Sequence, residues 1–382
     1  MSRQRTLTRH FRTGPILLAA SACCSALLSG CAGSGGAREP AIDPDVARAQ
    51  IARALPDKLG NRDGWAVDIF AALEALHVPP TMENACAVIA VGEQESSLQV
   101  DPQVPGLPAI ARREIEARAA SHHIPMLVVD AALALDSPTG ASYRRRLDNA
   151  RTEKALSDLY QDFIGMVPLG ERLFGDLNPV RTGGPMQVSI SFAEEHAKRR
   201  RYPYPVPTSI RDEVFTRRGG VYFGTAHLLD YSAPYDDILY RFADYNAGHY
   251  ASRNAGFQNA VGIASKISLA LDGDLLRHGS GADEPSKTEL AVRKLGKRLD
   301  LTDAQIRSDL ERGEGEGLER TKLYSRVFEL ADAAHGRPVP RAMVPRIALK
   351  SPKITRKLTT DWFAHRVDDR YQRCLARGGR GS

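Results

Sequence analysis

The chain has 382 residues, of which 42% are hydrophobic and 26% are charged. This balance is typical of a globular protein with a core, and it excludes a disordered chain and a polytopic membrane protein. The net charge of +6 falls to +2 without residues 1–30, because their four arginines leave 48 basic residues against 46 acidic ones. A near-neutral remainder predicts no nucleic-acid partner.

The first thirty residues have the pattern of an export signal. Arginines precede a short apolar run over 15–28, and small residues lead to Cys31. Such a run is too short to stay in the membrane as a spanning helix. The sequence Leu-Ser-Gly-Cys at 28–31 resembles the bacterial lipobox, which implies a lipoprotein signal peptide over 1–30 and a lipid on Cys31. An ordinary signal peptide is the alternative interpretation.

This resemblance sets the expected location of the protein. A lipid on Cys31 would anchor the chain to a membrane by burying acyl chains. Position 32, directly after Cys31, is alanine rather than aspartate, which favours export of the lipoprotein to the outer membrane. The sequence leaves open whether the protein faces the periplasm or the outside. In an oxidising compartment Cys86 and Cys374 form either a disulfide or two separately buried thiols.

The rest of the sequence predicts an all-α fold. Residues 31–43 predict a flexible tether. Apolar residues at three- and four-residue spacings predict helices over 44–272, and a polar, Gly-rich stretch separates them from a C-terminal helical extension over 287–382. Residues 124–129 are the best candidate for extended structure, with the start of a helix as the alternative. Helices are expected at 44–55, 64–76, 81–95, 108–121, 152–165, 209–232, 235–247, 254–271, 287–299, 303–334 and 352–376.

A carboxylate emerges from the end of one predicted helix. Residues 85–92 are apolar on every side, so their helix should be buried, and Glu93 and Glu95 follow directly. Partial burial would raise the pKa of such a carboxyl group, which suits a general acid near neutral pH. The two glutamates are two positions apart and point to different faces of the helix. Burial alone does not choose between them.

Three short motifs in chain order extend this interpretation. They are Gln-Glu-Ser-Ser at 94–97, Gly-Pro-Met-Gln at 184–187 and Tyr-Asn-Ala-Gly at 245–248, and Gly-Thr-Ala-His-Leu at 224–228 precedes the third. Together they resemble the signatures of lytic transglycosylases and goose-type lysozymes. The resemblance implies a lysozyme-like helical domain over 44–272 that acts on peptidoglycan glycan strands, with no metal and no cofactor.

The resemblance selects Glu95, the glutamate directly before serine, as the catalytic residue. Glu95 would protonate the glycosidic oxygen between N-acetylmuramic acid and N-acetylglucosamine and then, as a base, close a 1,6-anhydro ring. One carboxylate is enough for this reaction, in contrast to the two-carboxylate scheme of most glycosidases. The substrate-binding residues that the resemblance implies are Ser96, Met186, Gln187, Tyr245 and Asn246.

The sequence departs from that family pattern in three places. Pro185 stands where leucine is usual. Asp244 stands where alanine is usual, and it either raises the pKa of Glu95 or lies in solvent. A predicted helical insertion, about 103–178, forms a lid, a cleft wall or a plug in the groove. A plug predicts the alternative function, a non-catalytic outer-membrane lipoprotein that binds glycan or an envelope partner in assembly or peptide uptake.

Most of the mature chain also resembles a wider family. The stretches at 91–96, 149–154, 178–188 and 370–374 are similar to the YaiW-like family of poorly characterised proteobacterial outer-membrane lipoproteins. The resemblance implies an outer-membrane lipoprotein, and it supplies neither a settled activity nor a protein partner.

Overall fold

The described part of the chain is mainly helical. The computed structural model describes residues 43–166, 172, 175–277, 279, 283–349 and 358–379. Within them lie 17 α-helices and four strands of two residues each, which confirms the all-α fold. No helix among these residues is long and apolar enough to cross a membrane. The predicted signal peptide (1–30), Cys31 and all but the last residue of the predicted tether (31–43) lie outside the described residues.

The first three helices build a core around the third. They are α1 (Pro44–Ala54), α2 (Arg62–Ala75) and α3 (Met82–Ser96). Thr81 begins α3 by accepting a hydrogen bond from a backbone amide of the first turn. Residues 85–92 are buried on every side, as predicted, because α1, α2, α11 and α18 all pack against α3.

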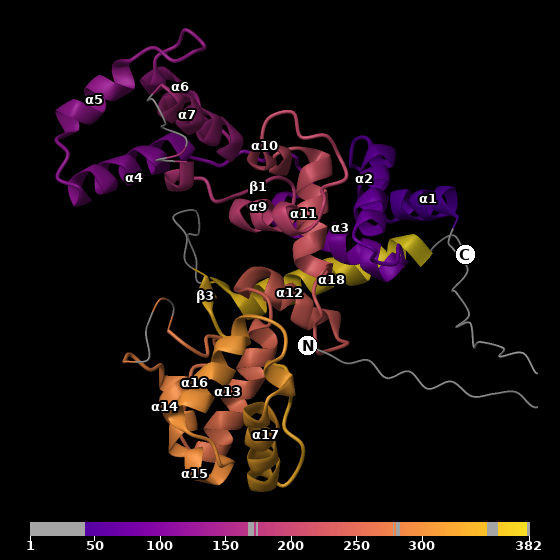
Figure 1. Cartoon of the computed structure of the whole chain (residues 1–382). Helices are drawn as coiled ribbons and strands as arrows, with labels where there is room; N and C mark the ends of the chain where they lie inside the picture. Colours follow the sequence, from indigo (N-terminus) through magenta and orange to yellow (C-terminus); the bar gives the residue numbers. More distant parts are fainter. Residues whose placement is uncertain are drawn as a thin grey trace, which may run out of the picture. The chain divides into compact units, whose positions relative to one another are not determined.

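The described residues of the predicted insertion include four helices, which are purple in Figure 1. They are α4 (Leu107–Ser121), α5 (Met126–Ala134), α6 (Tyr143–Asn149) and α7 (Glu153–Gly165). The candidate for extended structure at 124–129 is the start of α5. Helix α6 packs against α4, α5 and α7, so the insertion is a helical layer with contacts of its own.

A short hairpin and four helices follow the insertion. Strands β1 (Thr182–Gly183) and β2 (Val188–Ser189) pair in antiparallel fashion, after the 3-10 turn η1 (Gly175–Leu177). The helix expected at 209–232 is two helices, because Thr216 leaves the helical conformation and caps the second one. The helices are α9 (Ile190–Arg199), α10 (Ile210–Val214), α11 (Arg217–Leu229) and α12 (Ile238–Ala247).

A second hydrophobic core forms between α13 and the helices after it. Phe257, Val292 and Val327 are among its buried members. The helix expected at 303–334 is interrupted around Gly313, Gly315 and Gly317 by the 3-10 turns η2 (Arg312–Glu314) and η3 (Leu318–Arg320). The helices are α13 (Ala251–Ser265), α14 (Lys287–Lys294), α15 (Gly296–Leu299), α16 (Asp303–Glu311) and α17 (Lys322–His335).

The last helix returns to the first core. Strands β3 (Ala348–Leu349) and β4 (Leu358–Thr359) pair just before α18 (Thr360–Gly378), which packs along α3 and α12 (Figure 1). A disulfide joins Cys86 on α3 to Cys374 on α18. The two cores therefore divide the chain differently from the expected boundary near 272–286, since α13 belongs to the second core and α18 to the first.

Candidate functional site

The three sequence motifs meet at the turn of the β1–β2 hairpin, residues 184–187. The Ser96 hydroxyl, at the end of α3, donates a hydrogen bond of 2.7 Å to the carbonyl oxygen of Pro185. The Tyr245 hydroxyl, on α12, donates one of 2.7 Å to the carbonyl oxygen of Met186. Two helices distant in the sequence therefore hold neighbouring carbonyls of one turn.

The hairpin turn has a backbone that suits its residues. The Gln187 backbone amide donates a hydrogen bond of 3.1 Å to the Gly184 carbonyl, and this bond closes a four-residue turn. Pro185 occupies the second position, where its fixed φ is favoured, so its replacement of leucine is compatible with the turn. Gly184 has a φ of +71°, and a Cβ there would collide with the Val214 carbonyl oxygen. Glycine is therefore required at this position.

Met186 packs in the core beneath the turn. Its side chain is 1% exposed and lies against Gly224 of α11. A Cβ at Gly224 would lie 2.6 Å from the Cβ of Met186, so the Gly-Thr-Ala-His-Leu motif lets α11 approach the turn closely. The structure thus places Met186 in packing rather than at a surface that a glycan can reach.

The two glutamates at the end of α3 have different surroundings. Glu93 forms an ion pair of 3.2 Å with Arg377 of α18. Glu95 is partly buried and lies close enough to Tyr245 for its charge to raise the pKa of that phenol, in addition to the larger effect of burial. The geometry therefore separates a structural glutamate from one beside the motif residues.

The two predicted amide ligands make hydrogen bonds within the protein. The Gln187 Oε1 accepts a hydrogen bond of 3.3 Å from Thr182, and its Nε2 donates one of 3.2 Å to the Gly184 carbonyl. The Asn246 Oδ1 accepts one of 2.9 Å from the Thr360 hydroxyl at the start of α18. Gln187 therefore stays with the hairpin turn, whereas Asn246 is directed to the C-terminal helix.

Asp244 is fully buried, so of the two alternatives for this residue the one in which it lies in solvent is wrong. Its carboxylate accepts hydrogen bonds from the Tyr231 and Tyr235 hydroxyls and from the backbone amides of Tyr250 and Ser252. Burial raises its pKa to about 6, although these hydrogen bonds act in the opposite direction. Asp244 thus fixes the chain between α12 and α13.

His227 of α11, which was not among the predicted site residues, contacts the backbone of α12. The His227 Nε2 lies 3.3 Å from the Tyr245 carbonyl oxygen, and its ring stacks on His249 with centroids 4.5 Å apart. Burial lowers the pKa of His227 to about 3. The available signal was its place in the motif at 224–228, where the transglycosylase pattern has tyrosine. No group of His, Cys, Asp and Glu side chains in the described residues has the arrangement of a metal site.

These features define an all-α protein in which a glutamate at the end of a buried helix lies beside a hairpin turn held from two sides. Residues 58–377 match the family model described as "Protein of unknown function (DUF1615)", and the chain belongs to this family. One relative is the "Uncharacterized protein YaiW" of Escherichia coli (strain K12), which is 54% identical over 325 residues, or 85% of this chain and 88% of that protein. Membership of the YaiW-like family is therefore confirmed. No solved structure matches the chain.

Proposed function

We propose that the protein is a cell-envelope lipoprotein whose helical domain cleaves peptidoglycan glycan strands as a lytic transglycosylase. One observation carries the proposal. Ser96 and Tyr245 reach across 89 and 59 residues of sequence to hydrogen-bond adjacent carbonyls of the turn at 184–187, and Glu95 lies beside them. Motifs that merely matched by chance would have no reason to converge on one turn.

In the proposed reaction Glu95 acts first as an acid and then as a base. Its proton goes to the glycosidic oxygen as the bond to N-acetylmuramic acid breaks. The same carboxylate then takes the proton of the muramoyl 6-hydroxyl, which attacks the anomeric carbon and closes the 1,6-anhydro ring. The nucleophile belongs to the substrate, so neither a second carboxylate nor a metal ion is required.

Ser96 and Tyr245 are positioning residues in this proposal. Tyr245 keeps its proton at neutral pH, because burial and the nearby Glu95 raise its pKa, and it therefore donates to the Met186 carbonyl throughout. Ser96 fixes the end of α3, because its hydroxyl donates to the Pro185 carbonyl and accepts a hydrogen bond from the Gln99 backbone amide. Both contacts hold Glu95 in a constant orientation relative to the turn.

The envelope location rests on two features. The predicted lipid on Cys31 would anchor the protein in the outer membrane. The disulfide between Cys86 and Cys374 is a bond that persists in oxidising compartments such as the periplasm.

The test uses the chain from Ala32 onward, incubated with purified sacculi. The compact unit that the structure describes begins after Ala41, so the residues removed lie outside it. We expect fragments with 1,6-anhydromuramic ends, identified by their loss of water in mass spectrometry, and we expect Glu95→Gln to abolish them. Glu93→Gln is the matched control, because Glu93 pairs with Arg377 instead. Release by Glu95→Gln at the wild-type rate would refute the assignment.

A second candidate function is non-catalytic binding of glycan or of an envelope partner. It is favoured by the internal hydrogen bonds of Gln187 and Asn246 and by the burial of Met186, which leave these predicted ligands engaged within the protein. This alternative predicts that wild type and Glu95→Gln both bind sacculi in a sedimentation assay and that neither releases fragments.

A further inference from the structure

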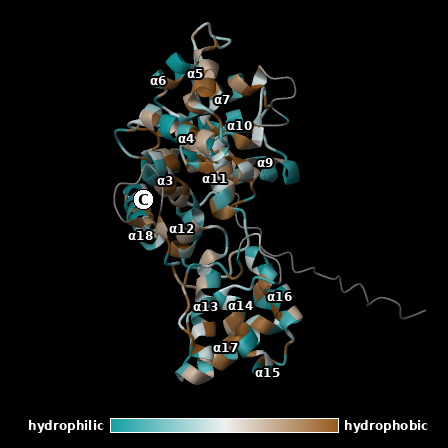
Figure 2. Cartoon of the chain, turned by 90° about the vertical axis from the view of Figure 1, so that its left-hand side faces the viewer, coloured by the Kyte–Doolittle hydropathy of each residue, from teal (hydrophilic) through white to brown (hydrophobic). Residues whose placement is uncertain are grey.

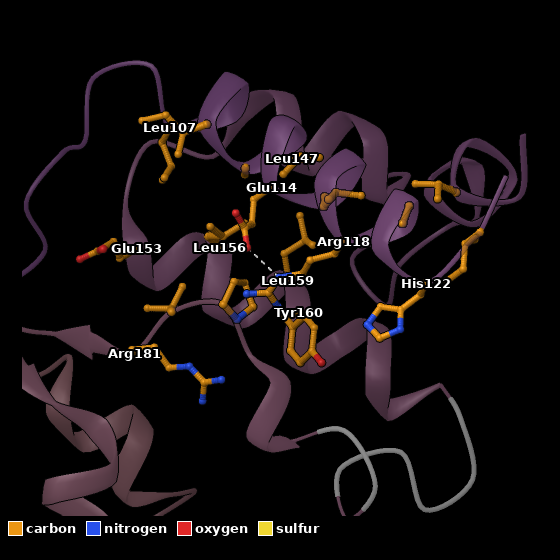
Figure 3. Close-up of a pocket in the computed structure, with 18 of the residues that line it drawn as sticks. Leu107, Glu114, Arg118, His122, Leu147, Glu153, Leu156, Leu159, Tyr160 and Arg181 are labelled. Atoms are coloured by element: carbon orange, nitrogen blue, oxygen red, sulfur yellow. Dashed lines mark hydrogen bonds and ion pairs between the residues drawn. The ribbon is translucent and has the colours of Figure 1, made fainter. Parts of the chain in front are cut away.

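The insertion encloses an apolar cavity that the proposed glycan chemistry does not use. It has a volume of about 600 Å³ and lies between α4 and α7, with α5, α6 and residues 179–182 completing its wall (Figure 3). This volume is within the range of small-molecule binding sites, roughly 300–1,000 Å³. The segment that leads into β1, residues 179–182, lines the cavity. Neither Glu95 nor the turn at 184–187 does so.

The wall of the cavity is built from helical stripes of aliphatic side chains. Leu107, Ala111 and Ile115 lie at four-residue spacings along one face of α4, and Leu156 and Leu159 face them from α7. A wall of this kind cannot satisfy the polar groups of a sugar or a peptide backbone. It favours a hydrocarbon, because each methylene group that leaves water for an apolar wall stabilises the complex.

Polar and charged side chains also line the cavity, where Arg118 and Arg181 accompany Glu114 and Glu153. Tyr160 lies there, with Arg118, Arg181 and Arg211 close enough to lower the pKa of its phenol against the larger, raising effect of burial. Arg118 is already paired with Glu114 at 2.7 Å (Figure 3). Arg181 is exposed, and its guanidinium makes no hydrogen bond or ion pair within the described ranges. The cavity wall thus offers one unpaired guanidinium beside a phenol.

The helix beside the cavity exposes apolar side chains to solvent. Ile124 and Val129 line the cavity, and the residues between them include Leu127 at 80% exposed and Val128 at 56%. Figure 2 shows hydrophobic colouring along α5. Exposed large apolar residues beside a cavity mark a surface that takes up apolar ligands or partners.

We propose that the insertion binds one long-chain fatty acid, with its alkyl chain between α4 and α7 and its carboxylate on Arg181. The apolar wall recognises the chain. A single unpaired guanidinium matches a single carboxylate, which it can hold through two parallel hydrogen bonds. A phospholipid would bring two chains and a bulkier head group to the same cavity, and it serves as the competing occupant in the test.

The binding experiment uses the lipid-free chain from Ala32 onward and cis-parinarate, a fluorescent long-chain carboxylate. We expect saturable binding at one site and displacement by dodecanoate. Dodecanol carries an alkyl chain of the same length without the charge, and we expect it to compete about tenfold more weakly, because it loses a charge-assisted hydrogen bond to Arg181. Phosphatidylglycerol vesicles are the third competitor.

Two pairs of variants locate the site. Arg181→Gln should weaken parinarate binding about tenfold. In this variant dodecanoate and dodecanol should compete with nearly equal affinity. Its matched control is Arg145→Gln, since Arg145 is also exposed on the insertion and lies outside the cavity wall. Ala111→Phe should fill the cavity and abolish binding, whereas Ala117→Phe places the same ring on the exposed side of the same helix.

Each outcome decides the proposal. Loss of binding in Ala111→Phe with an unchanged circular dichroism spectrum supports it, and Arg181→Gln keeps the test valid if Ala111→Phe does not fold. Absence of saturable parinarate binding overturns it. Equal competition by dodecanoate and dodecanol also overturns it, because the carboxylate would then have no partner. Binding to vesicles without fatty-acid binding would reassign the exposed face of α5 to a membrane surface.

Discussion

Among single residues, the buried polar groups of Tyr245 and His227 hold the motif region together through a small number of hydrogen bonds. The Tyr245 hydroxyl donates a hydrogen bond to the Met186 carbonyl of the hairpin turn. The Tyr245 backbone carbonyl accepts one from the His227 Nε2 of α11. His227 Nδ1 is buried and has no hydrogen-bond partner among the described residues. A protonated imidazole would be costly at such a position, since burial disfavours the charged form.

His227 should therefore make the protein sensitive to acid. Its pKa falls from 6.5 to about 3 in the folded state, so the unfolded chain binds a proton first as the pH falls. Stability is fully present above pH 6.5 and is lost as the pH falls toward 3, by an amount on the order of a few kcal/mol at about 1.4 kcal/mol per pKa unit. We expect His227→Gln to flatten the dependence of unfolding free energy on pH in this window, measured by urea titration.

Variants must be compared because Asp244 changes the stability of the fold with pH in the opposite direction to His227. The pKa of Asp244 is raised to about 6 from 3.8, so protonation between these values favours the folded state. The same substitution at His77, an exposed histidine just after α2, is the control for the change of residue type. Parallel curves for wild type and His227→Gln would show that this histidine does not carry the acid sensitivity.

At the scale of secondary-structure elements, the important contact is the approach of α11 to the hairpin turn. Gly224 has no side chain where Met186 packs, and Met186 cannot move away freely because Tyr245 holds its carbonyl. The sequence shows this glycine only as part of a weak motif. Its role becomes clear once α11 and the turn are seen in contact.

Gly224→Ala should consequently destabilise the fold by about 1–3 kcal/mol, since the new methyl group would overpack the contact. Met186→Ala removes the Sδ and Cε atoms that the new methyl group would meet, so Gly224→Ala should cost less in that background, and a double-mutant cycle of unfolding free energies measures the coupling. Gly165→Ala is the control, because a Cβ there meets nothing within 4 Å. Additive effects of the two substitutions would contradict the contact.

At the scale of the whole molecule, α18 closes the first core by returning to α3. The disulfide between Cys86 and Cys374 spans 288 positions of sequence, and the Glu93–Arg377 ion pair lies on the same two helices. A cross-link over so long a loop restricts the unfolded chain strongly. The second core, around Phe257, has no such link to its own end in the described residues.

Removal of the disulfide should cost about 2–5 kcal/mol of unfolding free energy. We expect this loss in the double variant Cys86→Ala, Cys374→Ala, measured by urea unfolding, and a similar loss when the wild type is reduced. Reductant should then have no effect on the double variant, which is the internal control. If oxidised and reduced wild type unfolded at the same urea concentration, the bond would have no stabilising role.

Local sequence patterns are enough to predict the helical class and most helix positions, because capping residues and three- and four-residue apolar spacing act locally. The apolar stretch at 85–92 likewise predicts a buried helix, and the motif resemblance selects Glu95 over Glu93. Only the packing of the chain in three dimensions shows that Ser96 and Tyr245 hold one turn, that Met186 packs beneath it and that Asn246 is directed to Thr360. It also shows that α18 belongs to the first core and that the insertion encloses a cavity. These features depend on contacts between residues far apart in the chain, and no local pattern records which buried surfaces will meet.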